Sequence, residues 1–128
     1  MSIFTKIIAG ELPCYKIHED DKTFSFLAIP PNQLGHTLVV PKKEIDHFID
    51  VPEEIYLQVM KNAYKISQAI FKAVDCKRIG SMVQGFEVPH FHYHLIPLNS
   101  PRDLDFSNAR ERSSQEMKEV QKKILKFL

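Results

Sequence analysis

The chain has 128 residues, of which 44% are hydrophobic, and its formal net charge is +1. This length and composition predict one globular domain, residues 1–128, with a core of ordinary size. The near-neutral charge provides no global field for nucleic acid or an anionic membrane, the apolar runs are far shorter than the ~20 residues that span a bilayer, and no secretory signal pattern is present, so we expect a cytoplasmic protein with no nucleic-acid or membrane partner.

The first half of the chain predicts one short helix and three strands. Gly10 and Pro13 end the helix. Asp20-Asp21-Lys22 is a polar turn between two segments that alternate as strands do, which predicts a hairpin. Pro30-Pro31 offers no N–H to a sheet ladder, so a loop precedes the third strand. The predicted helix covers residues 5–9, and the predicted strands cover residues 15–19, 23–29 and 36–41.

The second half predicts two helices and two more strands. Apolar residues recur at helical spacing from Tyr56 to Ala73 and indicate a helix of about six turns that begins after Pro52. The segment 99–112 has no periodicity and predicts a surface loop. Ser113-Ser114-Gln115-Glu116 is a capping box that opens a C-terminal helix, whose narrow apolar stripe could pack on its own domain or on a partner. The predicted strands cover residues 78–83 and 88–97.

Strands in hairpin order together with one long helix predict the α+β class. We expect an antiparallel meander of five strands, with the long helix on one face and a ligand groove on the other. Cys14 and Cys76 are too few and too far apart for a disulfide framework or a metal-binding knuckle.

Three of the six histidines recur with a period of two in the last predicted strand, at His90, His92 and His94. In a strand this spacing places the three imidazoles in a row on one face. Lys, Thr or Glu would serve a merely solvated face, so a functional role is the better explanation. Three imidazoles can ligate zinc and leave a fourth position open. Alternatively, one imidazole is a nucleophile that its neighbours orient. The residues alone leave both chemistries open.

The run His90-Phe91-His92-Tyr93-His94-Leu95-Ile96 matches His-φ-His-φ-His-φ-φ, with φ apolar. It closely resembles the signature of the histidine triad (HIT) family of nucleotide hydrolases and transferases. Segments upstream agree in order and spacing: residues 3–13, 19–27 and 35–43 resemble the opening helix, first hairpin and next strand of the family. The resemblance covers residues 3–98 and leaves 99–128 uncovered. It indicates a bacterial-type HIT-like protein and implies the HIT-like fold and a homodimer.

The resemblance implies a role for each histidine. His92 would attack the α-phosphorus of a nucleotide substrate and form a covalent nucleotidyl-histidine, which water releases as a nucleoside monophosphate. His94 would contact the phosphate and help to protonate the leaving group, while His90 and His36 would fix ring tautomers. The substrate would be a nucleoside phosphoramidate, a nucleoside monophosphate ester or a dinucleoside polyphosphate, with no metal or cofactor. The expected nucleotide contacts are Phe26, Leu27, Ile29, Asn32, Gln84, His92 and His94.

Three departures from the family pattern affect these expectations. The family commonly has Phe-x-Asp-Ile, whose acid accepts both ribose hydroxyls, but here the residue is Ala28. We therefore expect weak discrimination against 2′-deoxyribose, and a gain of about 10- to 100-fold in kcat/KM for Ala28→Asp with a ribose substrate. The loop before the triad is short: Gln84 is expected to replace a phosphate-side amide, and Glu87 is assigned no binding role because a carboxylate repels phosphate. Ser2-Ile3-Phe4-Thr5 replaces a zinc-binding Cys-x-x-Cys pair, so that zinc site is not expected.

Two other functions remain open from the sequence. Ala28 and the shortened loop would suit a nucleotide-binding or scaffold protein whose turnover is vestigial. His90, His92 and His94 could instead ligate a metal.

Overall fold

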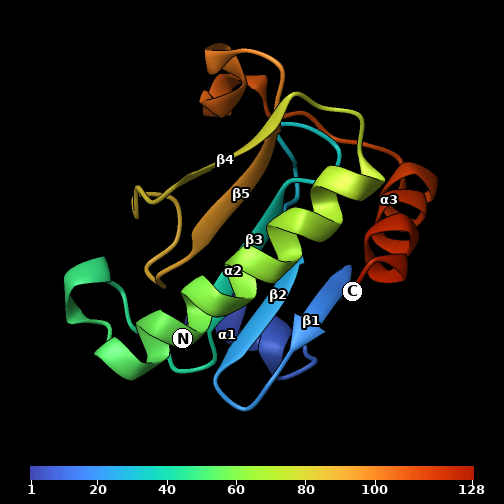
Figure 1. Cartoon of the computed structure of the whole chain (residues 1–128). Coiled ribbons are helices and arrows are strands. Elements are labelled where there is room, and N and C mark those ends of the chain that lie inside the picture. Colours follow the sequence, from blue (N-terminus) through green and yellow to red (C-terminus); the bar gives the residue numbers. More distant parts are fainter.

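We describe a computed structural model of all residues, Met1–Leu128. A five-stranded antiparallel sheet in the order β1-β2-β3-β5-β4 supports the rest of the chain (Figure 1). The α+β class with five antiparallel strands is confirmed. The order is not that of a simple meander, because β5 inserts between β3 and β4. The strands are β1 (Lys16–Glu19), β2 (Thr23–Leu27), β3 (Thr37–Pro41), β4 (Arg78–Met82) and β5 (Tyr93–Leu98).

Helices cover both faces of the sheet. Helix α2 (Glu53–Ala73) crosses one face, while α1 (Ile3–Ile8) lies behind the sheet and α3 (Ser114–Lys126) lies beside β1 (Figure 1). Because both faces are covered, every residue of β2 and β3 is buried. Three short 3-10 turns complete the structure: η1 (Phe48–Asp50), η2 (Pro101–Leu104) and η3 (Phe106–Asn108).

The side chains alternate between two cores, as the period of a strand requires. Leu27, Val39 and Leu95 pack with the buried stripe of α2 in the larger core. Phe26 and Leu38, their neighbours in sequence, belong to the smaller core with Phe4 of α1. Helix α3 also contributes to the larger core, through Met117, Val120 and Ile124, so its apolar stripe packs on its own domain.

The histidine segment departs from its prediction because β5 begins only at Tyr93. The N–H of Phe91 donates to the carbonyl of Ile45 at 2.6 Å, outside the sheet ladder, so His90 and His92 precede the strand. His94 lies inside the sheet, between Leu38 of β3 and Met82 of β4. No helix is both long and apolar enough to span a membrane.

Candidate active site

A cavity of about 530 Å³ opens on the sheet face that α1 covers, opposite α2, as the groove was expected to do. Side chains from α1, β2 and the loop after β2 make its walls mostly apolar. The hydrogen-bonding side chains gather in one part of the lining: Asn32, His36, Glu87, His92 and His94.

One ring nitrogen of His92 is committed to a backbone carbonyl. Its Nδ1 lies 2.7 Å from the carbonyl oxygen of His90, and because a carbonyl only accepts, Nδ1 carries a proton. The neutral ring therefore has its lone pair on Nε2. Phe4 holds the ring edge-to-face, with centroids 5.1 Å apart. The arrangement presents Nε2 as the nucleophilic atom.

A chain of hydrogen bonds sets the tautomer of His94. The backbone N–H of Asn32 donates to Nδ1 of His36 at 3.0 Å, so the proton of His36 is on Nε2. That nitrogen donates to Nδ1 of His94, 2.9 Å away. His94 must then carry its own proton on Nε2, which is buried and has no hydrogen-bond partner. The result is an N–H donor that is held ready for a ligand.

Burial keeps the rings of His36 and His94 neutral. Desolvation, with a smaller contribution from His92, lowers the pKa of His36 to about 3. Desolvation also lowers the pKa of His94 to about 3, helped by His36 and His92 and opposed by Glu87. At neutral pH His94 is thus a hydrogen-bond donor rather than an imidazolium.

His90 anchors the site from outside the cavity. Its Nε2 donates to the carbonyl of Pro41 at 2.8 Å, and its Nδ1 accepts from the hydroxyl of Ser2 at 2.7 Å. Burial lowers the pKa of His90, although the Pro41 carbonyl opposes this. Ser2 also caps α1, since its Oγ accepts from the N–H of Thr5. Ser2 was not predicted as a site residue, although an N-cap residue before the first helix was an available signal.

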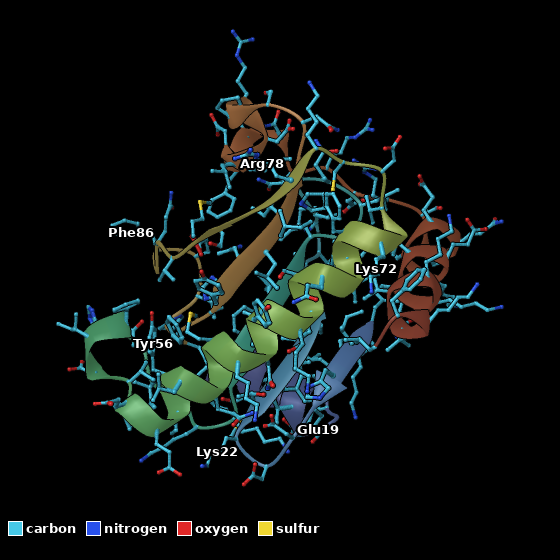
Figure 2. All side chains as sticks on the ribbon, viewed as in Figure 1. Glu19, Lys22, Tyr56, Lys72, Arg78 and Phe86 are labelled. Atoms are coloured by element: carbon cyan, nitrogen blue, oxygen red, sulfur yellow. The ribbon has the colours of Figure 1, made fainter.

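Glu87 is the residue that the structure places against expectation. Its Oε2 lies 2.6 Å from Nε2 of His92 and 3.7 Å from Nε2 of His94. Two lone pairs cannot face each other at 2.6 Å, so a proton lies between Glu87 and His92. Gly85, at φ +91°, turns the loop, and Phe86 points into solvent at its tip (Figure 2). The carboxylate of Glu87 reaches the cavity instead. Glu87 was expected to have no binding role, and the structure places its carboxylate on the cavity wall beside both histidines.

The segment 99–112 lies at the surface, as predicted, but it contains two 3-10 turns and its residues Phe106 and Ala109 also form a wall of the cavity. The side-chain Nδ2 of Asn32 donates to the carbonyls of Asp103 and Asp105, at 3.0 and 3.2 Å. These bonds bring Phe106 against His94, with ring centroids 4.9 Å apart. Oδ1 of Asn32 is buried and unpaired. Periodicity could not reveal this wall, because its anchor is an amide that precedes it by 71 residues.

The structure brings together most of the expected nucleotide contacts. Phe26, Leu27, Ile29 and Asn32 line the cavity with the two histidines, and so does Ala28. Gln84 does not line it: this residue lies in a second cavity of about 290 Å³, which reaches His92 from another side.

The donor geometry disfavours the metal-site alternative. Both ring nitrogens of His90 are engaged, by Ser2 and Pro41, so the three triad histidines do not form a ligand set. Glu87, His92 and His94 have ligand atoms within 4.8 Å of one another. However, His94 would have to lose its Nε2 proton to ligate a metal, which its bond from His36 opposes.

Comparisons with known proteins agree on one family. A HIT domain model matches residues 9–100. An uncharacterized HIT-like protein of Methanocaldococcus jannaschii is 38% identical over 101 residues, which cover 76% of this chain and 78% of that protein. The adenosine 5′-monophosphoramidase of Saccharomyces cerevisiae is 33% identical over 96 residues, covering 74% and 61% of the two chains. The crystal structure of a Hit-like protein from Bartonella henselae superposes with a TM-score of 0.88 at 32% identity, over 99% of this chain and 96% of that one.

Proposed function

The chain belongs to the HIT domain family, and from this membership we propose that it is a nucleotide hydrolase or transferase that cleaves its substrate at the α-phosphate through a covalent nucleotidyl-histidine on His92. The observation that carries the proposal is the tautomer of His92. A bond from Nδ1–H to the His90 carbonyl leaves Nε2 as the nitrogen that faces the cavity. The same carbonyl stabilises the positive charge that the ring acquires when Nε2 forms its bond to phosphorus.

The reaction has two displacement steps. The Nε2 lone pair attacks the α-phosphorus, and the bond to the leaving group breaks with its electron pair going to that group. Water then attacks the phosphorus, and the N–P electron pair returns to Nε2 as the nucleoside monophosphate departs. A second nucleophile in place of water makes the protein a transferase.

His94 serves this reaction as a hydrogen-bond donor to a phosphoryl oxygen. Its buried, unpaired Nε2–H is the kind of preorganised donor that stabilises developing negative charge. A role in protonating the leaving group has less support, because the pKa of about 3 keeps the ring neutral and a neutral imidazole is a very weak acid.

The apolar part of the cavity is proposed to hold the nucleoside. Phe26, Leu27 and Ile29 provide apolar walls that suit a base. The unpaired Oδ1 of Asn32 is an acceptor for a ribose hydroxyl, a role that Ala28 cannot fill. The name of the yeast monophosphoramidase makes adenosine phosphoramidates the first substrates to test, before nucleoside monophosphate esters and dinucleoside polyphosphates.

The test is release of AMP from an AMP–amine conjugate. We expect His92→Ala to abolish release, while His18→Ala, a histidine on edge strand β1, retains it. Undiminished turnover by His92→Ala would remove the nucleophile from the proposal.

One observation favours a second candidate, a nucleotide-binding protein with vestigial turnover. Glu87 lies on the nitrogen that would attack, so a substrate must displace the carboxylate or its proton. Tight AMP binding without turnover of any conjugate would support this candidate.

We also propose a homodimer, supported by an apolar groove between α2 and the β4–β5 edge of the sheet. Met60, Tyr64 and Ile79 are among its lining residues, and Tyr64 is exposed. Sedimentation of the wild type should give a mass of two chains, and sedimentation of Tyr64→Glu should give the mass of a single chain.

A further inference from the structure

We infer that Glu87 is a catalytic acid and base of this chain: it takes the proton from His92 when a nucleotide binds, donates it to the leaving group, and receives a proton from water in the second step. The inference rests on the proposed function. Glu87 is the one carboxylate on the cavity wall. Without such a role it would only repel the phosphate of the substrate.

The geometry places a mobile proton at the reacting atom. Oε2 of Glu87 is 2.6 Å from Nε2 of His92, so one proton is shared between them. The same oxygen is 3.7 Å from Nε2 of His94, the donor proposed for the phosphoryl group. Glu87 therefore adjoins both the nucleophile and the phosphate position, and its side chain is 33% exposed, which leaves it room to move.

No other side chain of the cavity is placed to supply the proton. The protons of His36 and His94 are fixed by the bond chain from Asn32, and the walls include no Lys, Arg, Asp or Tyr. Cys14 is the remaining titratable side chain on the walls, and burial raises the pKa of its thiol. His90 lies outside the cavity with both nitrogens engaged.

Binding of the substrate drives the proton toward Glu87. An anionic phosphoryl group beside a carboxylate favours its protonated form, because two negative charges repel in a desolvated site. Protonation removes the repulsion and at the same time leaves the Nε2 lone pair of His92 free to attack. The contact that blocks the nucleophile without substrate thus becomes the source of the proton with substrate.

The proton count closes over both steps for a phosphoramidate. In the first, Nε2 of His92 bonds to phosphorus, the P–N electron pair goes to the leaving nitrogen, and Glu87 gives that nitrogen its proton. In the second, water bonds to phosphorus, one of its protons goes to the Glu87 carboxylate, and the N–P pair returns to His92. The products are an amine and a nucleoside monophosphate, and the shared proton is restored.

The test compares two leaving groups with Glu87→Gln, which keeps the size of the side chain but removes the proton. An alkylamine must be protonated to leave, whereas sulfate is a very weak base and leaves without a proton. With an AMP–alkylamine conjugate we expect the first step to slow by about 10²- to 10⁴-fold. With the mixed anhydride of AMP and sulfate we expect a burst of sulfate, one per active site, at close to the wild-type rate.

The second step of the variant lacks its base, so the anhydride should leave AMP attached to the protein. Intact-mass measurement should detect this adduct on Glu87→Gln, and the double variant with His92→Ala should lack it. The burst also shows that the variant is folded. Glu53→Gln, an exposed acid in the first turn of α2, is the charge-matched control and should behave as the wild type.

Three results would overturn the assignment. Equal slowing of the first step with both leaving groups would mean that Glu87 acts only through position. Faster turnover of both substrates by Glu87→Gln would mean that Glu87 only blocks Nε2 of His92. If the wild-type protein releases AMP from neither substrate, the proposed function itself fails, and the role of Glu87 with it.

Discussion

Two buried asparagines in this molecule differ in how completely their side chains are hydrogen-bonded. Asn62 of α2 is fully paired: Nδ2 donates to Asp20 and to Thr23, both at 2.6 Å, and Oδ1 accepts from Gln58. Asn32 is only half paired, because Nδ2 holds two carbonyls of the C-terminal wall while Oδ1 has no partner. Both side chains are at least 97% buried, since their exposed fractions are 3% and 1%, so burial does not explain the difference.

The difference teaches which buried polar group stabilises the fold and which is kept for a ligand. An unpaired buried polar atom costs about 1–3 kcal/mol, so a chain rarely keeps one without a reason. Asn62 fastens α2 to the β1–β2 turn, which lies below α2 near Glu19 and Lys22 (Figure 2). Asn32 shares its state with His94, whose unpaired Nε2 lines the same cavity. Four predictions test this division.

The largest effect is expected from removing the unpaired donor. His94→Phe should lower kcat by about 10²- to 10³-fold, because the donor to the phosphoryl oxygen is lost. Relief of the unpaired Nε2 offsets the lost bond from His36, so the free energy of unfolding should change by less than about 1 kcal/mol. Single-turnover kinetics and urea unfolding measure the two quantities. If the activity of His94→Phe were lost because the variant is unfolded, His94 would have a structural role like that of Asn62.

Removing the paired asparagine should do the reverse. Asn62→Leu leaves the Asp20 carboxylate without its shortest donor, and we expect a loss of about 2–3 kcal/mol in the free energy of unfolding. At a temperature where the variant is folded, kcat/KM should stay within about twofold of the wild type. A selective rise in KM for the nucleotide would contradict the structural role.

The two regions should also lose stability at different pH. Burial lowers the pKa of His36 and His94 from 6.5 to about 3. Burial raises the pKa of Asp20, but hydrogen bonds from Asn62, Lys22 and Thr23 outweigh this and lower it from 3.8 to about 2. In each case the unfolded state takes up the proton first. The stability is therefore present above the unfolded value and is lost as the pH falls toward the folded one.

Because the unfolded rings take up protons below about pH 6.5 and the folded, hydrogen-bonded pair does not, the free energy of unfolding should fall with decreasing pH, by about 1.4 kcal/mol per pH unit for each extra proton that the unfolded state binds. His36→Asn should reduce the slope in that window, whereas Asp20→Asn should alter it only below about pH 4. Urea unfolding across pH 3 to 7.5 measures both. If the free energy of unfolding of the two variants changed with pH in the same way, the His36–His94 pair and Asp20 would not differ in the pH at which they lose stability.

The smallest effect concerns the sugar. If Oδ1 of Asn32 accepts a ribose hydroxyl, the wild type should prefer ribose to 2′-deoxyribose by about three- to tenfold in kcat/KM, and Asn32→Leu should bring the ratio near one. Asn62→Leu is the matched control and should keep the preference. If the wild type does not distinguish the two sugars, Asn32 does not bind the ribose hydroxyls. Ala28→Asp, which restores the acid of the family pattern, should then raise kcat/KM for the ribose substrate.

The sequence by itself determined most of the helices and strands and, within them, the face on which a side chain lies. The apolar stripe of α2 and the alternation of β2 and β3 depend on the local backbone period, which near neighbours in the chain set. The spacing of two also predicted His92 beside His94, and both line the groove, although β5 begins only at Tyr93 and His92 precedes it.

Only the tertiary structure decided which atoms of the site are free to react. The tautomer of His94 depends on a bond from His36, 58 residues away, and the wall at Phe106 depends on Asn32. The position of Glu87 depends on how a loop without periodicity turns at Gly85. Hydrogen-bond partners and protonation states follow from which groups share a buried volume, and distant segments of the chain supply these groups, so spacing along the sequence does not encode them.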